Sequence, residues 1–409
     1  MFLSNDTVFE LKEKYGTPLY VYSESILRER CREVKSLLLN KNFRVNYSAK
    51  ANTNLEILKI IRDEGLDVDA MSPGEIYIEQ LAGFESNQIF YISNNVSAEE
   101  MRYAIDRNIM ISVDSLSQLE MYGQINPGGR VAVRFNPGKG AGHHEKVITA
   151  GKKTKFGVQK ELIPQVKAIV EKYNLTLAGI NQHIGSLFLD WRDYIEGVCS
   201  FLEIAKEFPN LSFLDFGGGF GVPYRPGEIR LDLERLGKEL NIVLTKFLEE
   251  YPNKELIFKI EPGRFIVAEC GVLLGSVNSV KKSFDTTYIG TDIGFNVLAR
   301  PVMYDSYHEM EIVKSNIDSN GMNKDARIKA TIVGNICESG DILARDREIR
   351  GAEVGDMLIV YNAGAYGYVM SSNYNCRLRP AEVLIDLNGE ARLIRKRDTL
   401  ESLVQNFPA

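Results

Sequence analysis

The sequence predicts an α/β fold, in which a (β/α)8 barrel is followed by an all-β domain, and two observations support this prediction. From about residue 40 to residue 270, eight short apolar segments alternate with longer segments of helical period. Strands that alternate with helices are typical of a parallel sheet, and eight such units can close into a barrel. Beyond residue 270 the sequence changes to short runs rich in β-branched residues. Such runs indicate a second domain built of strands.

The elements of the predicted barrel follow one another regularly. The eight predicted strands are 43–51, 66–72, 88–94, 109–115, 130–137, 176–184, 211–219 and 255–263. Apolar residues at helical spacing predict seven helices between them, at 54–65, 73–83, 97–108, 116–125, 161–174, 191–208 and 230–251. Two of these helices also have a start signal, because Ser72 with Glu75 and Ser97 with Glu100 each fit a capping box.

The predicted β domain has its own signals. Its strand-like runs are 272–280, 286–293, 328–336, 356–364 and 381–396. The last run contains Asn388-Gly389, a strong signal for a hairpin with a two-residue turn. An early strand-like run, 17–23, precedes the barrel and could join this domain. We therefore predict a barrel over residues 28–270 and a β domain formed by residues 1–27 together with 271–409.

Composition limits the partners and the compartment. The chain has 409 residues, a net charge of -6 and 25% charged residues, so it has no basic excess for a nucleic acid or an anionic membrane. A small-molecule partner is expected. The five cysteines are odd in number and form no C-x-x-C pair, which argues against disulfides and a structural zinc site. Without a signal peptide or a long apolar segment, a cytoplasmic protein is expected.

The first predicted strand ends on a lysine. In 43–51, read with period two, Lys50 shares its face with Asn46 and Ser48. A lysine on an inward face is rare, because its ammonium group is costly to desolvate and tends to lose its proton. Such a lysine is a nucleophile. The alternative is a solvated lysine where the strand meets a loop.

Three further signals lie at predicted strand ends, where parallel barrels carry their reactive groups. The glycines at 217–221 could bind a phosphate or form a tight turn, and Arg264 could assist them or lie on the surface. Glu261 ends an apolar strand and needs a cation such as a protonated ring nitrogen. His183 could stack on a planar ligand, transfer protons or be structural. Together with Lys50, these groups suit pyridoxal 5'-phosphate.

Seven motifs extend this pattern along almost the whole chain: YSAKAN (47–52), HIGS (183–186), GGGFG (217–221), EPGR (261–264), RPVMYDSYH (300–308), CESGD (337–341) and GAYGYVMSSNYN (364–375). In this order they resemble the fold-type III pyridoxal-phosphate decarboxylases, and most closely the members that act on diaminopimelate. The resemblance implies an alanine-racemase-like barrel with a β domain. It also implies a homodimer with shared active sites.

The resemblance assigns roles to individual residues. Lys50 matches the lysine that bonds to the cofactor aldehyde, Glu261 the partner of the ring nitrogen, and His183 the group stacked on the ring. The other implied cofactor contacts are Asp69, Ser186, Gly218, Gly219, Gly263, Arg264 and Tyr366. Cys337 resembles the proton donor, which the family supplies from the other subunit. Such a role requires a thiol at the working pH, whereas by itself a cysteine is more simply a small buried hydrophobe.

The implied substrate is meso-2,6-diaminopimelate, decarboxylated to L-lysine and CO2. Its implied contacts are Arg264, Arg300, Tyr304, Glu338 and Tyr366. Arg300 and Glu338 provide one cation and one anion for the distal carboxylate and ammonium. The alternative substrates are ornithine, arginine, carboxynorspermidine, a carrier-bound amino acid, or a siderophore or antibiotic precursor. His143 and His144 are expected in a covering loop rather than as metal ligands, since no third ligand lies nearby in the sequence.

Other classes of protein fit the sequence less well. A racemase does not need Cys337 or the long C-terminal motif. A non-catalytic pyridoxal-phosphate carrier has no β domain. A binding module does not explain why four unusual signals lie at strand ends.

Overall fold

The computed structural model describes residues 2–92, 94–136, 155–315 and 326–408. The chain divides into two compact units: a barrel unit of residues 28–223 and 229–266, and a β unit of residues 1–27, 224–228 and 267–409. The second main boundary therefore lies at 266/267 rather than at 270/271, and the short segment 224–228 belongs with the strands. The loop with His143 and His144 lies outside the described residues.

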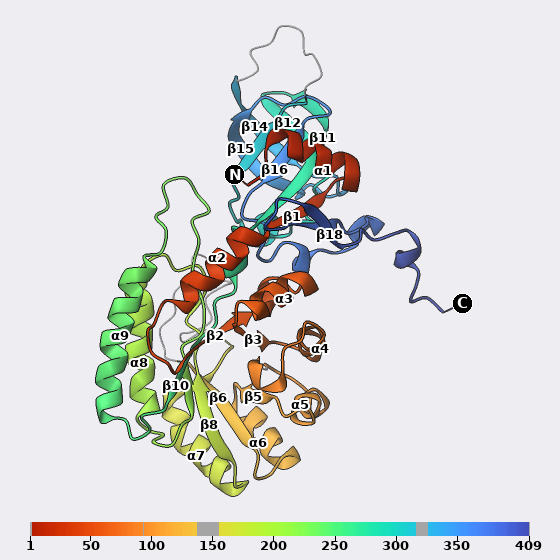
Figure 1. Ribbon diagram of the computed structural model, residues 1–409. Helices are drawn as coiled ribbons and strands as arrows, with labels where there is room; N and C mark the ends of the chain where they lie inside the picture. Colours follow the sequence, from red (N-terminus) through yellow and green to blue (C-terminus); the bar gives the residue numbers. More distant parts are fainter. Residues whose placement is uncertain (1, 93, 137–154, 316–325, 409) are drawn as a thin grey trace. The chain divides into compact units, whose positions relative to one another are not determined.

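The barrel unit contains a closed ring of eight parallel strands (Figure 1). These strands are β2 (Phe43–Ser48), β3 (Asp67–Ala70), β4 (Ile89–Ile92), β5 (Met110–Val113), β6 (Arg130–Asn136), β8 (Thr176–Asn181), β9 (Phe213–Asp215) and β10 (Ile257–Ile260). Each pairs with the next, and β10 pairs with β2 to close the ring. A short strand, β7 (Val158–Gln159), pairs with β6 outside the ring. The predicted barrel is confirmed, with all eight strands in place.

Helices α4 to α9 lie around the outside of these strands (Figure 1). All seven predicted helices are present, as α3 (Leu55–Asp63), α4 (Pro73–Leu81), α5 (Ala98–Ile105), α6 (Leu116–Ile125), α7 (Ile163–Lys172), α8 (Trp191–Ala205) and α9 (Leu233–Glu250). Two helices, α2 (Glu24–Lys35) and the short α10 (Arg264–Val267), were not predicted. Within the described ranges, no helix combines the length and the apolar composition needed to cross a bilayer.

The two predicted capping boxes differ in outcome. The box at Ser97 and Glu100 forms completely, because each side chain accepts the backbone N–H of the other residue. At α4 the hydroxyl of Ser72 accepts from the N–H of Glu75 at 3.2 Å, as predicted. The Glu75 carboxylate instead accepts from Met71 at 2.7 Å, one residue before the expected donor. The helix start is confirmed, but the second half of the box is wrong.

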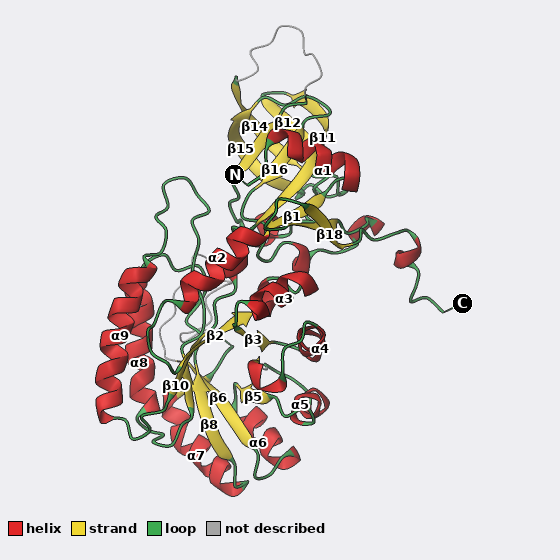
Figure 2. Cartoon of the chain, in the orientation of Figure 1, coloured by secondary structure: helices red, strands yellow, loops and turns green. Residues whose placement is uncertain are grey.

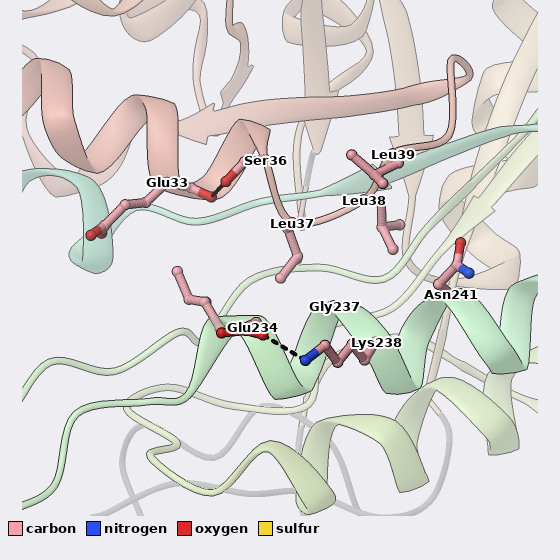
Figure 3. A pocket seen from close by; sticks show the side chains of 10 residues that line it. Glu33, Ser36, Leu37, Leu38, Leu39, Glu234, Gly237, Lys238 and Asn241 are labelled. Atoms are coloured by element: carbon pink, nitrogen blue, oxygen red, sulfur yellow. Dashed lines mark hydrogen bonds and ion pairs between the residues drawn. The ribbon is translucent and has the colours of Figure 1, made fainter.

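A cavity of about 560 Å³ lies between the chain that follows α2 and helix α9 (Figure 3). A Cβ atom on Gly237 of α9 would lie 2.3 Å from the carbonyl oxygen of Leu37. The close approach of loop and helix therefore requires glycine at this position. The ammonium of Lys238 pairs with Glu234 at 2.5 Å beside it. This cavity lies outside the ring of strands and away from the predicted reactive residues.

The β unit is dominated by strands (Figure 2). They are β1 (Leu19–Ser23), β11 (Gly271–Ser283), β12 (Thr286–Thr291), β13 (Met310–Val313), β14 (Arg327–Val333), β15 (Ile342–Arg350), β16 (Met357–Val360), β17 (Ala381–Ile385) and β18 (Ala391–Arg395). Their order is β15-β14-β12-β11-β1-β17-β18, with β16 on β11 and β13 on β16. The early strand β1 pairs with β11 and β17, so it lies inside this sheet.

Helix α1 (Asn5–Tyr15) closes the apolar core of the β unit. Its buried residues Val8 and Leu11 join a cluster with residues of β1, β11 and β16. The hairpin predicted at Asn388-Gly389 is present between β17 and β18. Its turn is longer than predicted, because the backbone N–H of Asp386 donates to the carbonyl oxygen of Glu390 at 3.0 Å and leaves three residues in the loop. Gly389, in this loop, has a φ of +85°. A three-residue loop with glycine in the left-handed region suits this geometry.

Candidate active site

The barrel unit contains a cavity of about 250 Å³. It is lined by Lys50, Met71, Ile92, Asn94, Arg134, Phe156, Asn181, His183 and Glu261. Three of these residues, Lys50, His183 and Glu261, are those that the sequence places at the ends of different strands. The closed ring of strands brings them to one cavity, as expected for the carboxyl ends of parallel strands.

Lys50 lies in a different local structure from the one predicted. Strand β2 ends at Ser48, and Lys50 is the middle residue of a 3₁₀ turn, η1 (Ala49–Ala51). Successive side chains of such a turn point in different directions, so Ala49 and Ala51 are buried while Lys50 is exposed. The prediction of a buried lysine at the end of a strand was therefore wrong. Lys50 nevertheless lines the cavity.

The ring of His183 has a defined orientation. Its Nδ1 atom accepts a hydrogen bond from the backbone N–H of Gly218 at 3.1 Å. Burial lowers the pKa of His183 well below its usual value, and the nearby cations Lys50 and Arg134 lower it further. A neutral imidazole that accepts at Nδ1 carries its proton on Nε2. His183 therefore presents an uncharged ring and one donor.

Glu261 has a buried carboxyl group beside a second acid. Its Oε1 atom has no hydrogen-bond partner among the described residues. Burial raises the pKa of Glu261 well above its usual value, and the neighbouring acids Asp215 and Asp69 raise it further. Asp215 is held at the end of β9, where it accepts the N–H of Gly217 at 2.9 Å. Glu261 therefore holds its proton more tightly than an exposed glutamate does.

A half-buried lysine lies on the strand next to Asp215. Lys259 is the partner of Asp215 in the register of β10 and β9. Its ammonium lies 5.1 Å from the ring centre of Phe90 and 4.9 Å from that of Phe213. Burial lowers the pKa of Lys259, while Asp215 raises it. The ammonium of Lys259 in turn lowers the pKa of Asp215.

Arg134 lines the cavity but was not among the predicted site residues. It is 9% exposed, and its guanidinium carbon lies 4.7 Å from the ring centre of Phe156. Its Nη2 atom is buried without a hydrogen-bond partner in the described ranges. The sequence does contain a signal for Arg134, since it interrupts the apolar strand 130–137, just as Lys50 interrupts the predicted strand 43–51. The same argument applies to Asp215 in 211–219.

Two further buried acids lie close to the cavity. Asp69, predicted to be near the cofactor, is fully buried at the end of β3. Burial raises the pKa of Asp69 to about 8, although Lys50 lowers it. Burial likewise raises the pKa of Glu79 in α4 to about 9, and Asp69 and Glu75 raise it further. Asp69 and Glu79 therefore keep their protons to higher pH than exposed acids do.

The loops after β8, β9 and β10 meet at the glycine cluster. A Cβ atom on Gly218 would lie 2.0 Å from the carbonyl oxygen of Glu261. Gly219 has a φ of +103°, in the region that favours glycine. A Cβ atom on Gly263 would lie 2.9 Å from the side chain of Ser48. Only glycine permits this close approach of the three loops.

Arg264 donates a hydrogen bond from Nη2 to the hydroxyl oxygen of Ser186 at 3.1 Å. An arginine, a hydroxyl and glycine-rich backbone form a donor set that suits a phosphate. The buried Glu261 Oε1 and Arg134 Nη2 atoms also lack partners among the described residues. The residues present therefore fit pyridoxal 5'-phosphate, with one end for a phosphate and another for a basic ring nitrogen.

The remaining predicted residues belong to the β unit. They are Arg300, Tyr304, Cys337, Glu338 and Tyr366. Arg300 is 2% exposed, and its Nη1 atom lies 2.8 Å from Nε2 of His308. His308 donates from Nδ1 to the carbonyl oxygen of Tyr361, so its Nε2 accepts from Arg300. Tyr366 has a φ of +56°, a strained conformation for a tyrosine.

The loop 337–341 is held by several hydrogen bonds while its first two side chains remain exposed. The N–H of Cys337 donates to Oδ1 of Asn375 at 2.8 Å, and the hydroxyl of Tyr374 donates to Glu338 at 2.5 Å. Asp341 is 3% exposed and accepts the N–H of Ile336 at 2.7 Å. The reading of Cys337 as a buried hydrophobe is wrong, because its side chain is exposed.

Metal chemistry has no support from the described side chains. In the ranges that the structure describes, no group of three or more histidine, cysteine, aspartate or glutamate residues is arranged to hold a metal ion.

Comparison with known proteins agrees with this site. Residues 24–268 match the family described as "Pyridoxal-dependent decarboxylase, pyridoxal binding domain". The diaminopimelate decarboxylase of Methanothermobacter thermautotrophicus is 41% identical, over 98% of this chain and 94% of that protein. A crystal structure of diaminopimelate decarboxylase has a TM-score of 0.92 and 32% identity, covering 99% of this chain and 96% of that chain.

A third relative was solved with a bound ligand. The Helicobacter pylori diaminopimelate decarboxylase complexed with L-lysine has a TM-score of 0.88 and 30% identity, covering 97% of this chain and 98% of that chain. Each of these three relatives matches the chain over both of its units, whereas the family model matches the barrel unit. The chain therefore belongs to the pyridoxal-dependent decarboxylase family and, within it, to the diaminopimelate decarboxylases.

Proposed function

We propose that this protein decarboxylates meso-2,6-diaminopimelate to L-lysine and CO2, with pyridoxal 5'-phosphate as its cofactor. In this reaction a carbon–carbon bond breaks, CO2 leaves and a proton is added to the carbon that remains. Bound pyridoxal 5'-phosphate supplies an acceptor for the electron pair that CO2 leaves behind. The proposal places the chemistry in the barrel cavity and makes the enzyme a carboxy-lyase of lysine biosynthesis.

Several residues of the cavity would hold the cofactor. Lys50 would hold its aldehyde, and His183 would present its uncharged ring to the planar face. Glu261 would give up its proton to the ring nitrogen, because a cation at that place stabilises the buried carboxylate. The phosphate would be held by Ser186, Gly218, Gly219, Gly263 and Arg264. Asp69 and Tyr366 complete the proposed contacts.

The substrate would be recognised by residues of opposite charge. Arg300 and Arg264 would bind carboxylates, Glu338 the distal ammonium, and Tyr304 and Tyr366 would add hydroxyl groups. Cys337 would deliver the proton, and a second copy of the chain would supply it, so we propose a homodimer. Five free cysteines agree with the reducing cytoplasm as its compartment.

One observation carries the proposal. Lys50, His183 and Glu261 come from three different strand ends and line a single cavity, in a chain 41% identical to a diaminopimelate decarboxylase. A reactive amine, an uncharged imidazole and a buried acid form the set that pyridoxal-dependent chemistry requires. No observation favours a second function.

The test is release of CO2 by the cofactor-loaded protein. The panel contains meso-diaminopimelate, its LL and DD isomers, lysine, ornithine, arginine and carboxynorspermidine. We expect release from the meso compound, with lysine as the product. A strong kinetic preference for ornithine or arginine would contradict the proposal.

A further inference from the structure

The β unit contains a second polar cavity, of about 460 Å³, which the proposed reaction does not use. Its walls come from the segment 305–307, from the segment 340–347 and from Arg225. Three arginines line it, Arg225, Arg345 and Arg347. The whole chain has a net charge of -6, so this concentration of positive charge does not follow from a basic composition.

Tyr307 fixes two of the arginines. The guanidinium carbon of Arg347 lies 3.7 Å from the centre of the Tyr307 ring, and that of Arg225 lies 5.2 Å from it. Arg347 also donates to the carbonyl oxygen of His308 at 2.9 Å. The hydroxyl of Tyr307 donates to Glu309 at 2.8 Å, which holds the ring in place. A guanidinium stacked on a ring keeps further N–H donors for a ligand.

The residues that line this cavity carry more positive than negative charge. Within the described residues, none of the three arginines forms an ion pair with a carboxylate, and Asp305 is the acid among the lining residues. The hydroxyl of Ser306 also lines the cavity, and its oxygen is buried with no hydrogen-bond partner in the described ranges. Arg225 and Arg345 are exposed, and Arg347 has further N–H donors besides the one bonded to His308, so guanidinium donors remain available to a ligand.

We propose that this cavity binds a small polyanion, a molecule with two or more carboxylate or phosphate groups. Guanidinium groups bind such anions with two parallel hydrogen bonds each. The proposed substrate carries two ammonium groups beside its two carboxylates and has almost no net charge, so a cavity lined by three arginines suits an anion without ammonium groups better. The site is therefore distinct from the barrel cavity and takes a different class of ligand.

The same cavity adjoins elements that carry proposed substrate residues. Helix α11 (Arg300–Tyr304) runs directly into the segment 305–307. Gly340 lines the cavity and belongs to the loop of Glu338. Resting on the proposed function, we expect a bound polyanion to change the KM for diaminopimelate rather than kcat, because both elements bind substrate in that proposal.

Calorimetry of the cofactor-loaded protein without substrate tests the binding. The probes are citrate and inorganic phosphate in about 0.15 M salt, where exposed charges are partly screened. We expect saturable binding of at least one probe, weakened about tenfold or more in Arg225→Gln and in Arg345→Gln. Both side chains are exposed, so neither change should disturb folding. Arg102→Gln, an exposed arginine of α5, is the matched control and should bind as the wild type does.

The two probes separate the sources of the anion. Binding of citrate alone identifies a carboxylate ligand, and binding of phosphate alone identifies a phosphate ligand. No saturable heat with either probe up to about 10 mM would overturn the proposal, as would equal weakening in Arg102→Gln.

Kinetics test the coupling separately. The KM for diaminopimelate should change about twofold or more with the bound probe in the wild type, and not in Arg345→Gln. Binding without this change keeps the site and removes the coupling. Binding to a protein that releases no CO2 from any amino acid would overturn the proposed function and leave the polyanion site intact.

Discussion

At the scale of the residue, two buried glutamates of the barrel unit illustrate how position decides function. Glu261 and Glu79 are both buried, and burial is the first cause of the raised pKa of each. Glu261 lines the cavity, so a ligand cation can reach it. Glu79 lies in α4, outside the lining of the cavity. Glu261 can therefore contact a ligand in the cavity, whereas Glu79 is enclosed by protein.

The first prediction concerns Glu261→Gln. An amide can neither give a proton to the cofactor ring nitrogen nor balance its positive charge, so electrostatic support for the reaction is lost. We expect CO2 release to fall on the order of 100-fold while the bound cofactor remains visible by absorbance. Glu79→Gln is the matched control and should retain activity. Equal losses in both variants would show that burial, and not contact with the cofactor, explains the effect.

The second prediction concerns stability and pH at Glu79. Its pKa is about 9 in the folded protein against an ordinary value of 4.5. Between these values the folded state binds more protons, so this contribution is full below about pH 4.5 and falls as pH rises towards 9. One such group changes the free energy of unfolding by up to about 1.4 kcal/mol per pH unit.

Urea unfolding of wild type and Glu79→Gln at pH 5.5, 7 and 8 measures this effect. We expect the wild type to lose more stability than the variant as the pH rises, because glutamine does not titrate. Because Asp69 interacts with Glu79, the difference between the two profiles reports the linked titration of both acids. Parallel pH profiles for the two proteins would contradict a raised pKa at Glu79.

Individual site residues were predictable from the sequence to different degrees. Lys50, His183 and Glu261 could be found because each is a polar residue at the end of an apolar segment. The exposure of Lys50 could not, since it depends on the 3₁₀ turn that follows the strand. Arg134 had the same signal within strand 130–137. The sequence could not show whether its side chain points into the cavity, because that depends on how the closed ring of strands orients each residue.

At the scale of the element, the barrel was easier to predict than the β unit. Its strands are buried runs separated by helices with clear periodicity, and all were found. In the β unit, β13 (Met310–Val313) and β15 (Ile342–Arg350) were missed. Strand β15 reads ILARDREIR, and its charged residues hide the apolar pattern. It forms a strand because it pairs along β14, a contact that no local pattern contains.

The third prediction concerns the loop at the end of β9. A Cβ atom on Gly218 would lie 2.0 Å from the Glu261 carbonyl oxygen, a backbone atom that cannot move away alone. We expect Gly218→Ala to cost roughly 1–3 kcal/mol of stability and to weaken cofactor binding. The control is Gly74→Ala in α4, where the nearest atom would be 3.6 Å away. Alanine there should be neutral or stabilise by up to about 1 kcal/mol.

Urea unfolding and titration with pyridoxal 5'-phosphate measure both effects. A loss of cofactor binding without any loss of stability would place the effect in the phosphate contacts alone. Wild-type behaviour of Gly218→Ala would mean that the loops after β9 and β10 can separate, contrary to the geometry of the glycine cluster.

At the scale of the whole molecule, the proposed site residues are divided between two units. Lys50, His183 and Glu261 belong to the barrel unit, whereas Cys337 and Glu338 lie on an exposed loop of the β unit. An exposed loop can serve the cavity of another copy as well as that of its own chain. In the proposed homodimer, the loop of each chain serves the cavity of the other chain. A dimer of two different variants distinguishes this arrangement from one in which each loop serves its own chain.

The fourth prediction uses heterodimers isolated with two different affinity tags. In a dimer of Lys50→Ala and Cys337→Ala chains, shared sites leave one site complete, with Lys50 from one chain and Cys337 from the other. We expect about half of the wild-type activity, because one of the two symmetry-related sites is intact. Each homodimer should be almost inactive.

The matched control pairs a wild-type chain with a chain that carries both substitutions. Shared sites then contain no complete pair, so this second heterodimer should be almost inactive, although it contains the same four side-chain positions as the first. The reverse result, with activity only in the second heterodimer, would show that each chain uses its own Cys337 and would remove the need for a dimer in catalysis.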